Sequence, residues 1–427
     1  MLKIYRERDL PGFFGQLDEK RNSAETDVTK IVLQIIEDVR QNGDTALKKY
    51  TEKFDGVSPE SFEIPIEKAT EALDKSRIKG PLLAAAKNIK QYHEKQVAHG
   101  FKTESADGCV VGRRVLPLKR VGVYVPGGKA AYPSSVLMNA IPAKVAGVEE
   151  IIMVTPPPKN EDENTDILAA ASVAGVDRIF YCGGAQALAA LAYGTQTVPK
   201  TDKIVGPGNI YVATAKKLLF GTVDIDMIAG PSEICVIADE GAEDGYVAAD
   251  LLSQAEHDEL ASSVLICFSE EKARRVEKQI EIQLQSLSRR EIIIRSLKNN
   301  GAAIICDGIK NALEIANKIA PEHLELCVNE PFKYLDSVKN AGSVFLGYYS
   351  PEPLGDYYAG PNHVLPTSGT ARFFSPLSVE SFTKTSSFIY YTASALSKAA
   401  SDITAIARAE RLTAHANAIE IRNGKQK

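Results

Sequence analysis

The stretch from Arg120 to Thr155 decides the fold class. It reads "RVGVYVPGG" (120–128), then a helix-like "SSVLMNAIPAKVAG" (134–147), then "EIIMVT" (150–155). Apolar strands separated by a helix of this length are typical of a βαβ unit, and a run that is apolar throughout indicates a strand buried on both faces. The stretch therefore predicts a parallel sheet covered by helices.

The alternation of apolar strands and helices continues along the chain to about residue 347. Further apolar runs are "DRIFYC" (177–182), "DKIVGPG" (202–208), "ICVIAD" (234–239), "SSVLICF" (262–268), "AAIICD" (302–307) and "GSVFLG" (342–347), with helical segments between them. We expect an α/β fold with two doubly wound, incomplete Rossmann-like parallel-sheet domains and helical tail segments at both ends.

The two ends of the chain do not continue the alternation. Residues 1–22 read as an N-terminal tail segment, and 376–427 as an alanine-rich, amphipathic helical tail that needs a core of its own or of a partner. Between them, we expect a first, discontinuous α/β domain over 23–124 and 231–375, and a second over 125–230.

Composition narrows the class of partner. The 427 residues are 44% hydrophobic and 25% charged, with a formal net charge of −5. That balance has no electrostatic footprint for nucleic acid. No window approaches about 18 consecutive apolar residues, and "MLKIYRERDLPGFFG" lacks a signal-peptide core, so we expect a cytoplasmic protein that binds no membrane. The six cysteines form no CxxC pair and are expected to be reduced.

A polar pair stands out in "LLSQAEHDELASS" (251–263). On an ideal helix Gln254 and His257 lie about 60° apart and can face one site. Imidazole suits zinc, and a glutamine carbonyl adds a weak, exchangeable oxygen ligand. Taken alone, such a pair is more often a solvated or capping face than a metal site.

The other histidines favour a site. His93 and His99 lie in the charged "QYHEKQVAHG" and read as surface residues, whereas His323, His363 and His415 each stand beside acids, amides or turn residues. A lone buried histidine usually only satisfies a hydrogen bond. Several in such contexts indicate a chemical role.

Glu322 and His323 are adjacent in "APEHLELC". Neighbouring residues point about 100° apart on a helix and to opposite faces of a strand, so the two share a pocket only if Pro321 interrupts the regular backbone. A shared pocket would hold two proton-transfer groups of different ordinary pKa, which suits acid and base steps near neutrality. The alternative is a strand start with a solvated glutamate.

Two further groups lie in loops. "LGDYYAGPNHVLPTSGTARF" (354–373) is a long, turn-dense loop of a kind that is often functional, and its Asp356 is a hard anionic ligand. Tyr124, Gln186 and Asn209 follow successive strands at the carboxyl edge of one sheet, where open α/β folds bind ligands. "IVGPGNIYVATAKKL" is only part of a dinucleotide fingerprint, because Tyr211 replaces the third glycine.

These motifs, with "DMIAGPSEICVIAD" and "ERLTAHANAI", resemble the histidinol dehydrogenase family over essentially the whole chain. The resemblance implies a zinc-dependent, NAD-linked homodimer. It implies oxidation of L-histidinol to L-histidine in two successive hydride transfers, through an enzyme-held aldehyde, L-histidinal, at the end of histidine biosynthesis.

The resemblance also implies residue roles. It makes Glu322 and His323 the acid/base pair, and Glu410 and His415 contributions from the partner subunit through an exchanged tail. The implied zinc ligands are Gln254, His257, Asp356 and His415; the NAD contacts are Tyr124, Gln186 and Asn209; the substrate contacts are Ser232, Gln254, His257, His323, Asp356, Glu410 and His415. Since Glu410 and His415 lie about 140° apart on an ideal helix, we expect a helix boundary between them.

Four alternatives stay open. An aldehyde could be oxidised through a thiohemiacetal on Cys327 or Cys235, although apolar neighbours make a thiol inert. A zinc hydrolase would use metal-bound hydroxide without NAD. A relative with the same fold could oxidise another hydroxymethyl compound, and a non-catalytic oligomer scaffold would leave the polar cluster without a purpose.

Overall fold

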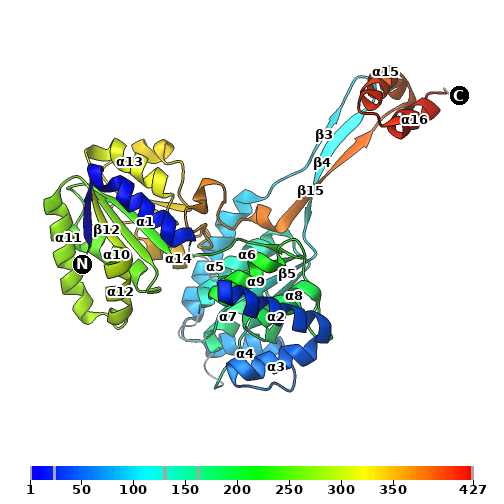
Figure 1. The fold of residues 1–427 in the computed structure, drawn as a ribbon. Coiled ribbons are helices and arrows are strands. Elements are labelled where there is room, and N and C mark those ends of the chain that lie inside the picture. The colour runs from blue at the N-terminus through cyan, green and yellow to red at the C-terminus, as the bar shows by residue number, and fades with distance from the viewer. Residues whose placement is uncertain (1, 23–25, 128–131, 161–163, 425–427) are drawn as a thin grey trace. The chain divides into compact units, whose positions relative to one another are not determined.

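The computed structural model describes residues 2–22, 26–127, 132–160 and 164–424. It divides into a larger unit, Met1–Gln96 with Leu118–Phe382, and a smaller one, Val97–Pro117 with Thr383–Lys427. The larger unit contains two six-stranded sheets, which we call sheet I and sheet II (Figure 1). The predicted class, doubly wound α/β with parallel sheets, is confirmed.

Sheet I is parallel throughout and is buried on both faces. In β10, Ile234 and Val236 pack with one set of helices, α10, α11 and α12, while Cys235 and Ile237 pack with α1 and α13 on the other face. The strands in spatial order are β1 (Lys3–Arg6), β12 (Gly301–Ile305), β11 (Ser262–Cys267), β10 (Glu233–Ala238), β13 (His323–Cys327) and β14 (Ser343–Leu346). The helices are α1 (Leu10–Asn22), α10 (Asp244–Ala255), α11 (Glu270–Gln283), α12 (Arg290–Asn300), α13 (Gly308–Ile319) and α14 (Glu352–Tyr357).

Sheet II repeats the plan. In β6, Ile151 and Met153 face α4 to α7, while Ile152 and Val154 face α2, α3, α8 and α9. Its strands are β2 (Glu63–Ile64), β7 (Arg178–Tyr181), β6 (Glu150–Thr155), β5 (Arg120–Tyr124), β8 (Lys203–Val205) and β9 (Asp224–Ile225); only β2 is antiparallel to its neighbour. The helices are α2 (Thr26–Asn42), α3 (Asp44–Asp55), α4 (Glu67–Lys75), α5 (Lys79–His93), α6 (Pro133–Ala146), α7 (Thr165–Ala174), α8 (Gly184–Tyr193) and α9 (Ile210–Leu219).

Each sheet has a point where the chain reverses its direction of winding. In sheet II the central β5 lies between β6 and β8, and in sheet I the central β10 lies between β11 and β13. Ligands of open α/β sheets bind beyond the carboxyl ends of the strands at such a point. The crevice between β5 and β8 is therefore the expected ligand position on sheet II.

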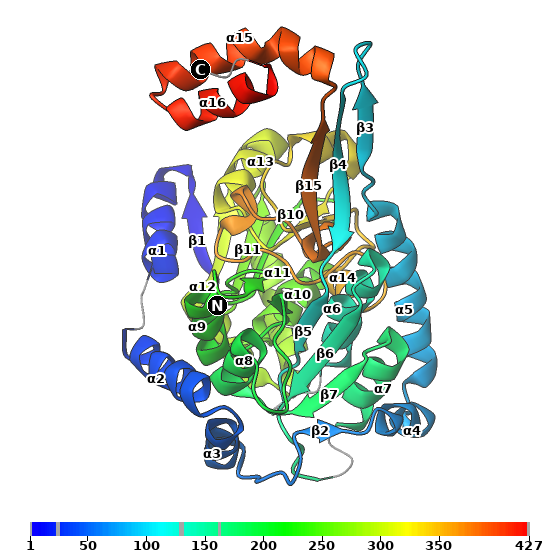
Figure 2. The ribbon, with the colours of Figure 1, turned by 90° about the vertical axis from the view of Figure 1, so that its right-hand side faces the viewer.

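The smaller unit is an antiparallel sheet with two helices. β4 (Val110–Pro117) pairs with β3 (Phe101–Glu104) on one side and with β15 (Thr383–Tyr390) on the other, and α15 (Ala393–Ala409) and α16 (Thr413–Arg422) follow β15 (Figure 2). Most residues of β3 and β15 are exposed.

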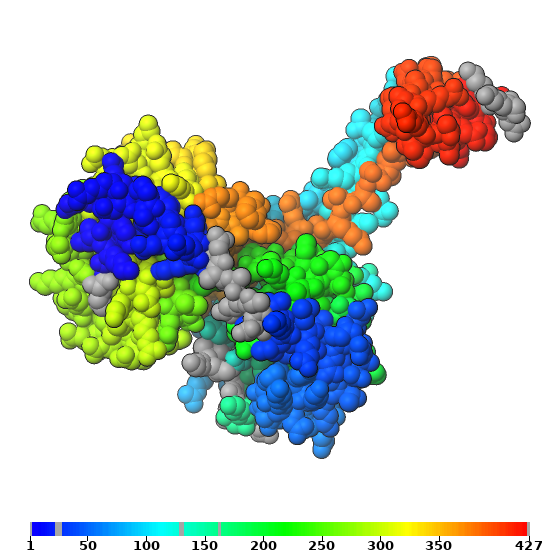
Figure 3. All heavy atoms as spheres, in the orientation of Figure 1, coloured from blue at the N-terminus to red at the C-terminus, as the bar shows by residue number. Residues whose placement is uncertain are grey.

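Strand pairing departs from the expected segment boundaries at three places. The N-terminal segment 1–22 supplies β1, which pairs with β12, and α1, whose Phe13 and Phe14 join the core of sheet I. Figure 3 shows dark blue N-terminal residues lying on the yellow-green part of the chain that contains sheet I. Most of 23–124, expected in the first domain with 231–375, belongs to sheet II instead: residues 120–124 form its central strand, β2 lies at its edge, and α2 to α5 cover its faces. The C-terminal tail is not wholly helical, because 383–390 forms β15. Long-range pairing decides each case, and a four-residue run such as "KIYR" contains no signal for its partner strand.

Two other sequence features have outcomes in the structure. All six cysteines are free and buried. His93, expected at the surface, is fully buried, and its Nδ1 lies 2.7 Å from Gln96 Oε1. Within the described ranges, the helices include none that is long and apolar enough to cross a membrane.

Candidate active site

Glu322 and His323 lie at the amino edge of sheet I. Helix α13 ends at Ile319, Ala320 takes a left-handed φ of 52°, and Pro321 and Glu322 lead into β13, which begins at His323. This break meets the condition for a shared pocket, since Glu322 Oε2 is 3.6 Å from His323 Nδ1.

The backbone of Glu233 holds both side chains. Its N–H donates to Glu322 Oε2 at 2.9 Å, and its carbonyl oxygen lies 3.2 Å from His323 Nδ1. A carbonyl oxygen only accepts, so Nδ1 carries the imidazole proton and Nε2 keeps its lone pair. His323 Nε2 has no hydrogen-bond partner in the described part of the chain. It is therefore free to accept a proton.

Burial sets the proton affinities of the pair in opposite directions. The exposed fractions of Glu322 and His323 are 7% and 4%. Desolvation raises the pKa of Glu322 well above its ordinary value and lowers the pKa of His323 to about 4, because burial disfavours the charged form of each group. Burial therefore gives the Glu322 carboxyl a higher proton affinity than an exposed glutamate has, and it keeps the His323 imidazole neutral near neutrality.

Arg21, in the segment read from sequence as a tail, supports this edge from α1. Its Nη2 is 2.9 Å from Glu233 Oε1, and Nη1 donates to the Ile319 carbonyl at 3.1 Å. Both side chains of the ion pair are about one-tenth exposed. Burial raises the pKa of Glu233, and the guanidinium opposes that shift. Arg21 thus helps to fix the residue whose backbone holds the acid/base pair.

Donors for a divalent ion gather at the same edge. Gln254 lies in the last turn of α10, and His257 follows the helix end, its N–H donating to the Gln254 carbonyl at 3.2 Å. The sequence predicted that Gln254 and His257 share one helix. This is wrong, because α10 ends at Ala255 and His257 lies beyond it. Atoms of His257, Glu352 and Asp356 lie within 4.8 Å of one another.

The hydrogen bonding of the buried Gln254 amide indicates whether these residues fit a metal ion. Gln254 is 0% exposed, and neither Oε1 nor Nε2 has a hydrogen-bond partner among the described residues. Buried polar groups are almost always satisfied, so a missing ligand is the simplest account of this one. An imidazole, carboxylates and an amide oxygen form a donor set that zinc accepts. The residues present fit the ion.

Glu352 was not predicted from sequence, and His363 was counted among the histidines that favour a site but was given no specific role. Glu352 is 1% exposed, and its Oε1 lies 3.9 Å from His323 Nε2; burial, aided by the Asp356 carboxylate, raises its pKa to about 9. His363 Nδ1 lies 3.1 Å from the carbonyl oxygen of Asp356. The i, i+4 spacing of Glu352 and Asp356 behind Pro351 was a usable signal, because it puts both acids on one helix face.

Tyr124, Gln186 and Asn209 lie around the switch point of sheet II. Tyr124 ends β5, and its hydroxyl oxygen accepts from the Gly184 N–H at 3.2 Å. Asn209 caps α9, accepting from the N–H groups of the first turn. Gln186 Oε1 is buried with no partner among the described residues. An orphaned amide oxygen at this crevice fits a bound ligand such as a dinucleotide.

The loop after β8 passes closely over β5. Gly206 has a φ of 115°, and a Cβ at that position would collide with the Tyr124 carbonyl oxygen. Asp226 Oδ2 accepts the Gly206 N–H at 2.8 Å, and Lys216 binds both Asp226 and the Gly206 carbonyl. Only glycine permits this approach, so the loop is held against the strand that ends at Tyr124.

The remaining residues divide between the two units. Ser232 directly precedes β10, and its carbonyl accepts from the Ser262 N–H at 2.9 Å, so it lies beside Glu233 at the same sheet edge. Glu410 and His415 belong to the smaller unit, where both are exposed. The expected helix boundary between them is confirmed: α15 ends at Ala409, Arg411 has a φ of 62°, and α16 begins at Thr413.

The α/β fold, with the acid/base pair Glu322 and His323 at the amino edge of sheet I, is typical of an α/β enzyme. A family model described as "Histidinol dehydrogenase" matches residues 18–423. Relatives named histidinol dehydrogenase are 54% identical in Clostridium acetobutylicum, over 99% of both chains, and 55% identical in Bacillus cereus, over 96% of both. A crystal structure of histidinol dehydrogenase from Elizabethkingia anophelis superposes with a TM-score of 0.93 at 37% identity, covering 99% of this chain and 98% of that one. The chain belongs to the histidinol dehydrogenase family and is an oxidoreductase.

The depressed pKa of His323 predicts an acid-sensitive contribution to stability. The unfolded chain takes up a proton on this histidine as pH falls below its ordinary pKa of 6.5, whereas the folded chain does so only near pH 4. Stability is therefore lost between those values, and His323→Asn should remove about 2–3 kcal/mol of that loss at pH 4.5. Urea denaturation of both proteins in EDTA from pH 4.5 to 7 measures it. Parallel curves would contradict the assignment, since the titration of Glu322 is common to both.

Proposed function

We propose that this protein oxidises L-histidinol to L-histidine in two successive hydride transfers, with L-histidinal held on the enzyme, as the last steps of histidine biosynthesis in the cytoplasm. The observation that carries the proposal is the set of donors at the sheet edge that holds Glu322 and His323. Donor atoms of His257 and Asp356 lie within 4.8 Å of each other, and the buried amide of Gln254, in the last turn of α10, has no partner among the described residues. High identity to relatives named histidinol dehydrogenase, over nearly their full length, supports the substrate.

The proposed metal ligands are Gln254, His257 and Asp356 of one subunit and His415 of the other. When bound, zinc would supply a positive template for the substrate's nitrogen atoms and so orient its carbinol carbon. The ligand types suit that task. The neutral glutamine oxygen would be the weakest donor of the set and the most readily exchanged.

The acid/base residues act on protons in both oxidations. His323 Nε2 accepts the alcohol proton as the carbinol hydride departs, and its Nδ1 stays bonded to the Glu233 carbonyl. In the second oxidation Glu322 takes a proton from a water that adds to the aldehyde carbon, which yields a hydrate. A second hydride and proton leave the hydrate to give the carboxylic acid. The raised pKa of Glu322 makes its carboxylate a stronger base than an exposed glutamate.

NAD is the proposed hydride acceptor, and each oxidation consumes one molecule. Tyr124, Gln186 and Asn209 are its proposed contacts, at the sheet II crevice where the Gln186 amide oxygen lacks a partner among the described residues. Burial raises the pKa of Tyr124 to about 12, so its hydroxyl keeps its proton as a donor near neutrality.

The smaller unit supports a homodimer with exchanged tails. Large apolar side chains are exposed on its sheet and helices, including Ile389 at 72% and Ile406 at 63%. An apolar surface of this kind on so small a unit needs a partner to cover it. We propose that the unit docks on a second copy, so that Glu410 contacts the partner's substrate and His415 completes the partner's metal site. Ser232 is the proposed substrate contact beside Glu233.

The structure bears on one mechanistic alternative. Burial raises the pKa of both Cys235 and Cys327 far above that of a free thiol, and carboxylates near each thiol add to the shift. A thiolate nucleophile is therefore disfavoured at both positions. A route through Glu322 and His323 requires neither thiol.

Counting reduced nicotinamide per substrate tests the proposed function. Anaerobic turnover of limiting L-histidinol should yield two NADH per substrate. Prior treatment with EDTA should abolish turnover, and added Zn²⁺ should restore it. Absorbance at the reduced-nicotinamide wavelength gives the count. One NADH per substrate would place the second oxidation elsewhere, and none would favour a hydrolase or a dehydrogenase for another hydroxymethyl compound.

A further inference from the structure

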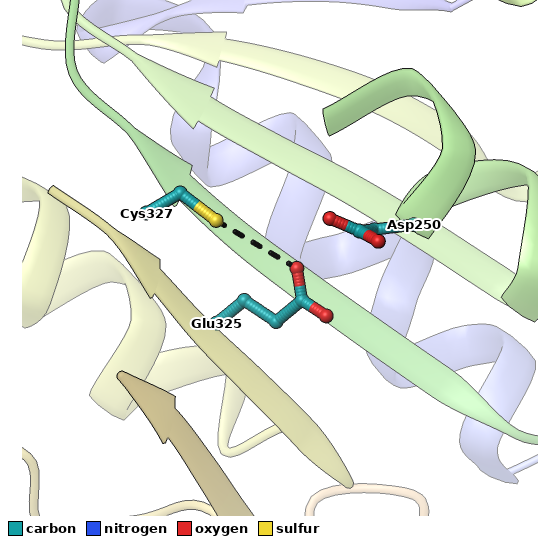
Figure 4. A group of neighbouring side chains, drawn as sticks. All are labelled: Asp250, Glu325 and Cys327. Atoms are coloured by element: carbon teal, nitrogen blue, oxygen red, sulfur yellow. Dashed lines mark hydrogen bonds between the residues drawn. The ribbon is translucent and has the colours of Figure 1, made fainter. Parts of the chain in front are cut away.

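Two buried acids lie behind the candidate metal site in the interior of sheet I. Every second residue of a strand points to the same face, so on β13 one face carries His323, Glu325 and Cys327. Figure 4 shows Glu325 on β13 facing Asp250, which comes from α10, with Cys327 Sγ 3.8 Å from Glu325 Oε2. Glu325 is 1% exposed and Asp250 8%. A carboxyl group in the middle of a buried strand needs a reason.

Glu325 binds the first turn of the helix that carries Asp356. Its Oε1 accepts the Glu352 N–H at 2.8 Å, in a buried hydrogen bond across 27 residues. Glu352 is the first residue of α14, and Pro351 at the N-cap offers no capping side chain. The first N–H groups of a helix need acceptors from outside it, and Glu325 supplies one. Asp356 lies one turn further along the same short helix.

A second contact links α10 to the same point. Ser253 precedes Gln254; its Oγ donates to the Asp250 carbonyl at 2.9 Å and also lies 3.4 Å from Glu352 Oε2. Asp250 lies one turn earlier on α10, against Glu325. The elements that carry Gln254, His323 and Asp356 are therefore joined through Glu325 and Glu352.

Asp250 and Glu325 do not both carry a negative charge. Burial raises the pKa of Asp250 to about 6 and that of Glu325 well above its ordinary value, the charge of Asp250 adding to the second shift. Two buried carboxylates in contact do not both ionise, so the pair retains a proton. A shared proton leaves Glu325 Oε1 available as the acceptor for α14.

We propose that Glu325 is a positioning residue of the metal site: by capping α14 from the core, its carboxyl sets Asp356 relative to Gln254 and His323, and the affinity for zinc depends on it although Glu325 does not touch the ion. The inference rests on the metal site of the proposed function. Residues that orient ligands in this way typically change metal affinity by 10–100-fold when replaced.

Zinc affinity of the full-length protein tests the role. Zn²⁺ dissociation constants from chelator competition are compared for wild type, Glu325→Gln and Glu325→Leu, with the visible spectrum of the Co²⁺ form as a signature of donor geometry. Glu325→Gln keeps an acceptor for the Glu352 N–H and should bind zinc like wild type. Glu325→Leu should bind about 10–100-fold more weakly, with an altered Co²⁺ spectrum.

Asp226→Asn is the matched control for stability. Asp226 directly follows β9 of sheet II, and its carboxylate is 2% exposed and lies 2.6 Å from Lys216 Nζ. Its replacement should lower Tm and leave zinc affinity unchanged. If Glu325→Leu does not fold, Ser253→Ala removes the other contact to Glu352 and should weaken zinc binding several-fold.

The outcomes separate this inference from the proposed function. A folded Glu325→Leu, or failing that Ser253→Ala, that binds zinc like wild type overturns the positioning role. A Glu325→Gln as weak as Glu325→Leu also overturns it, because then the acceptor is not what matters. A second zinc per chain, lost in Glu325→Gln, would instead make Asp250, Glu325 and Cys327 ligands, whose atoms do lie within 4.8 Å of one another. Absence of zinc binding by wild type contradicts the proposed function itself.

Discussion

The Glu322→Gln enzyme is expected to release one NADH per L-histidinol instead of two. Glutamine keeps an oxygen that accepts the Glu233 N–H, so the pocket keeps its geometry. It cannot take a proton from water, so the aldehyde is not hydrated at a useful rate. Loss of one general base typically lowers a rate by about 10²–10⁴-fold. The first oxidation should proceed, and L-histidinal should accumulate on the enzyme.

His323→Asn should differ from Glu322→Gln in kind. The variant lacks the free Nε2 lone pair beside the substrate, so the first hydride transfer should slow by about 10²–10⁴-fold and little aldehyde should form. Supplied L-histidinal separates the two variants, because Glu322→Gln should fail to oxidise it. If both variants produced two NADH at equal, reduced rates, the division of labour between Glu322 and His323 would be wrong.

Mixing two inactive variants should restore about a quarter of wild-type activity. We consider His415→Asn and Gln254→Ala, each of which removes one proposed ligand from every site of its own homodimer. In a heterodimer with exchanged tails, both substitutions fall in the same site. The other site then has an intact Gln254 and an intact His415. Random reassociation makes about half of the dimers mixed, each with one working site of two, which gives the quarter.

A second pair of variants provides the control. Gln254 and Asp356 belong to the same unit of one chain, so mixing Gln254→Ala with Asp356→Asn should restore nothing. Reversible dissociation in mild denaturant followed by a turnover assay measures both mixtures. Recovery in neither mixture would contradict tail exchange, and recovery in both would mean that Asp356, like His415, reaches its site from another subunit.

The break at Pro321 and the boundary between Glu410 and His415 show how far local arguments reach. Both were predictable because each follows from the angle between residues a fixed number apart on a regular element. His257 shows the limit of such arguments. The predicted angle between Gln254 and His257 assumed that the helix continues to His257, but α10 ends two residues earlier, at Ala255. The donors still meet, because a turn brings His257 back beside the acids of α14.

The sequence by itself determined the α/β class, the two sets of parallel strands and the short motifs that contain the acid/base pair and most proposed ligands. These are properties of neighbouring residues, whose periodicity and turn chemistry act over a few positions. Only the tertiary structure decided that β1 joins sheet I, that Arg21 supports Glu233 across 212 residues, and that Glu325 caps the helix carrying Asp356. Those roles arise from contacts between segments far apart in the sequence, and a local pattern encodes neither the partner of a strand nor the partner of a buried polar side chain.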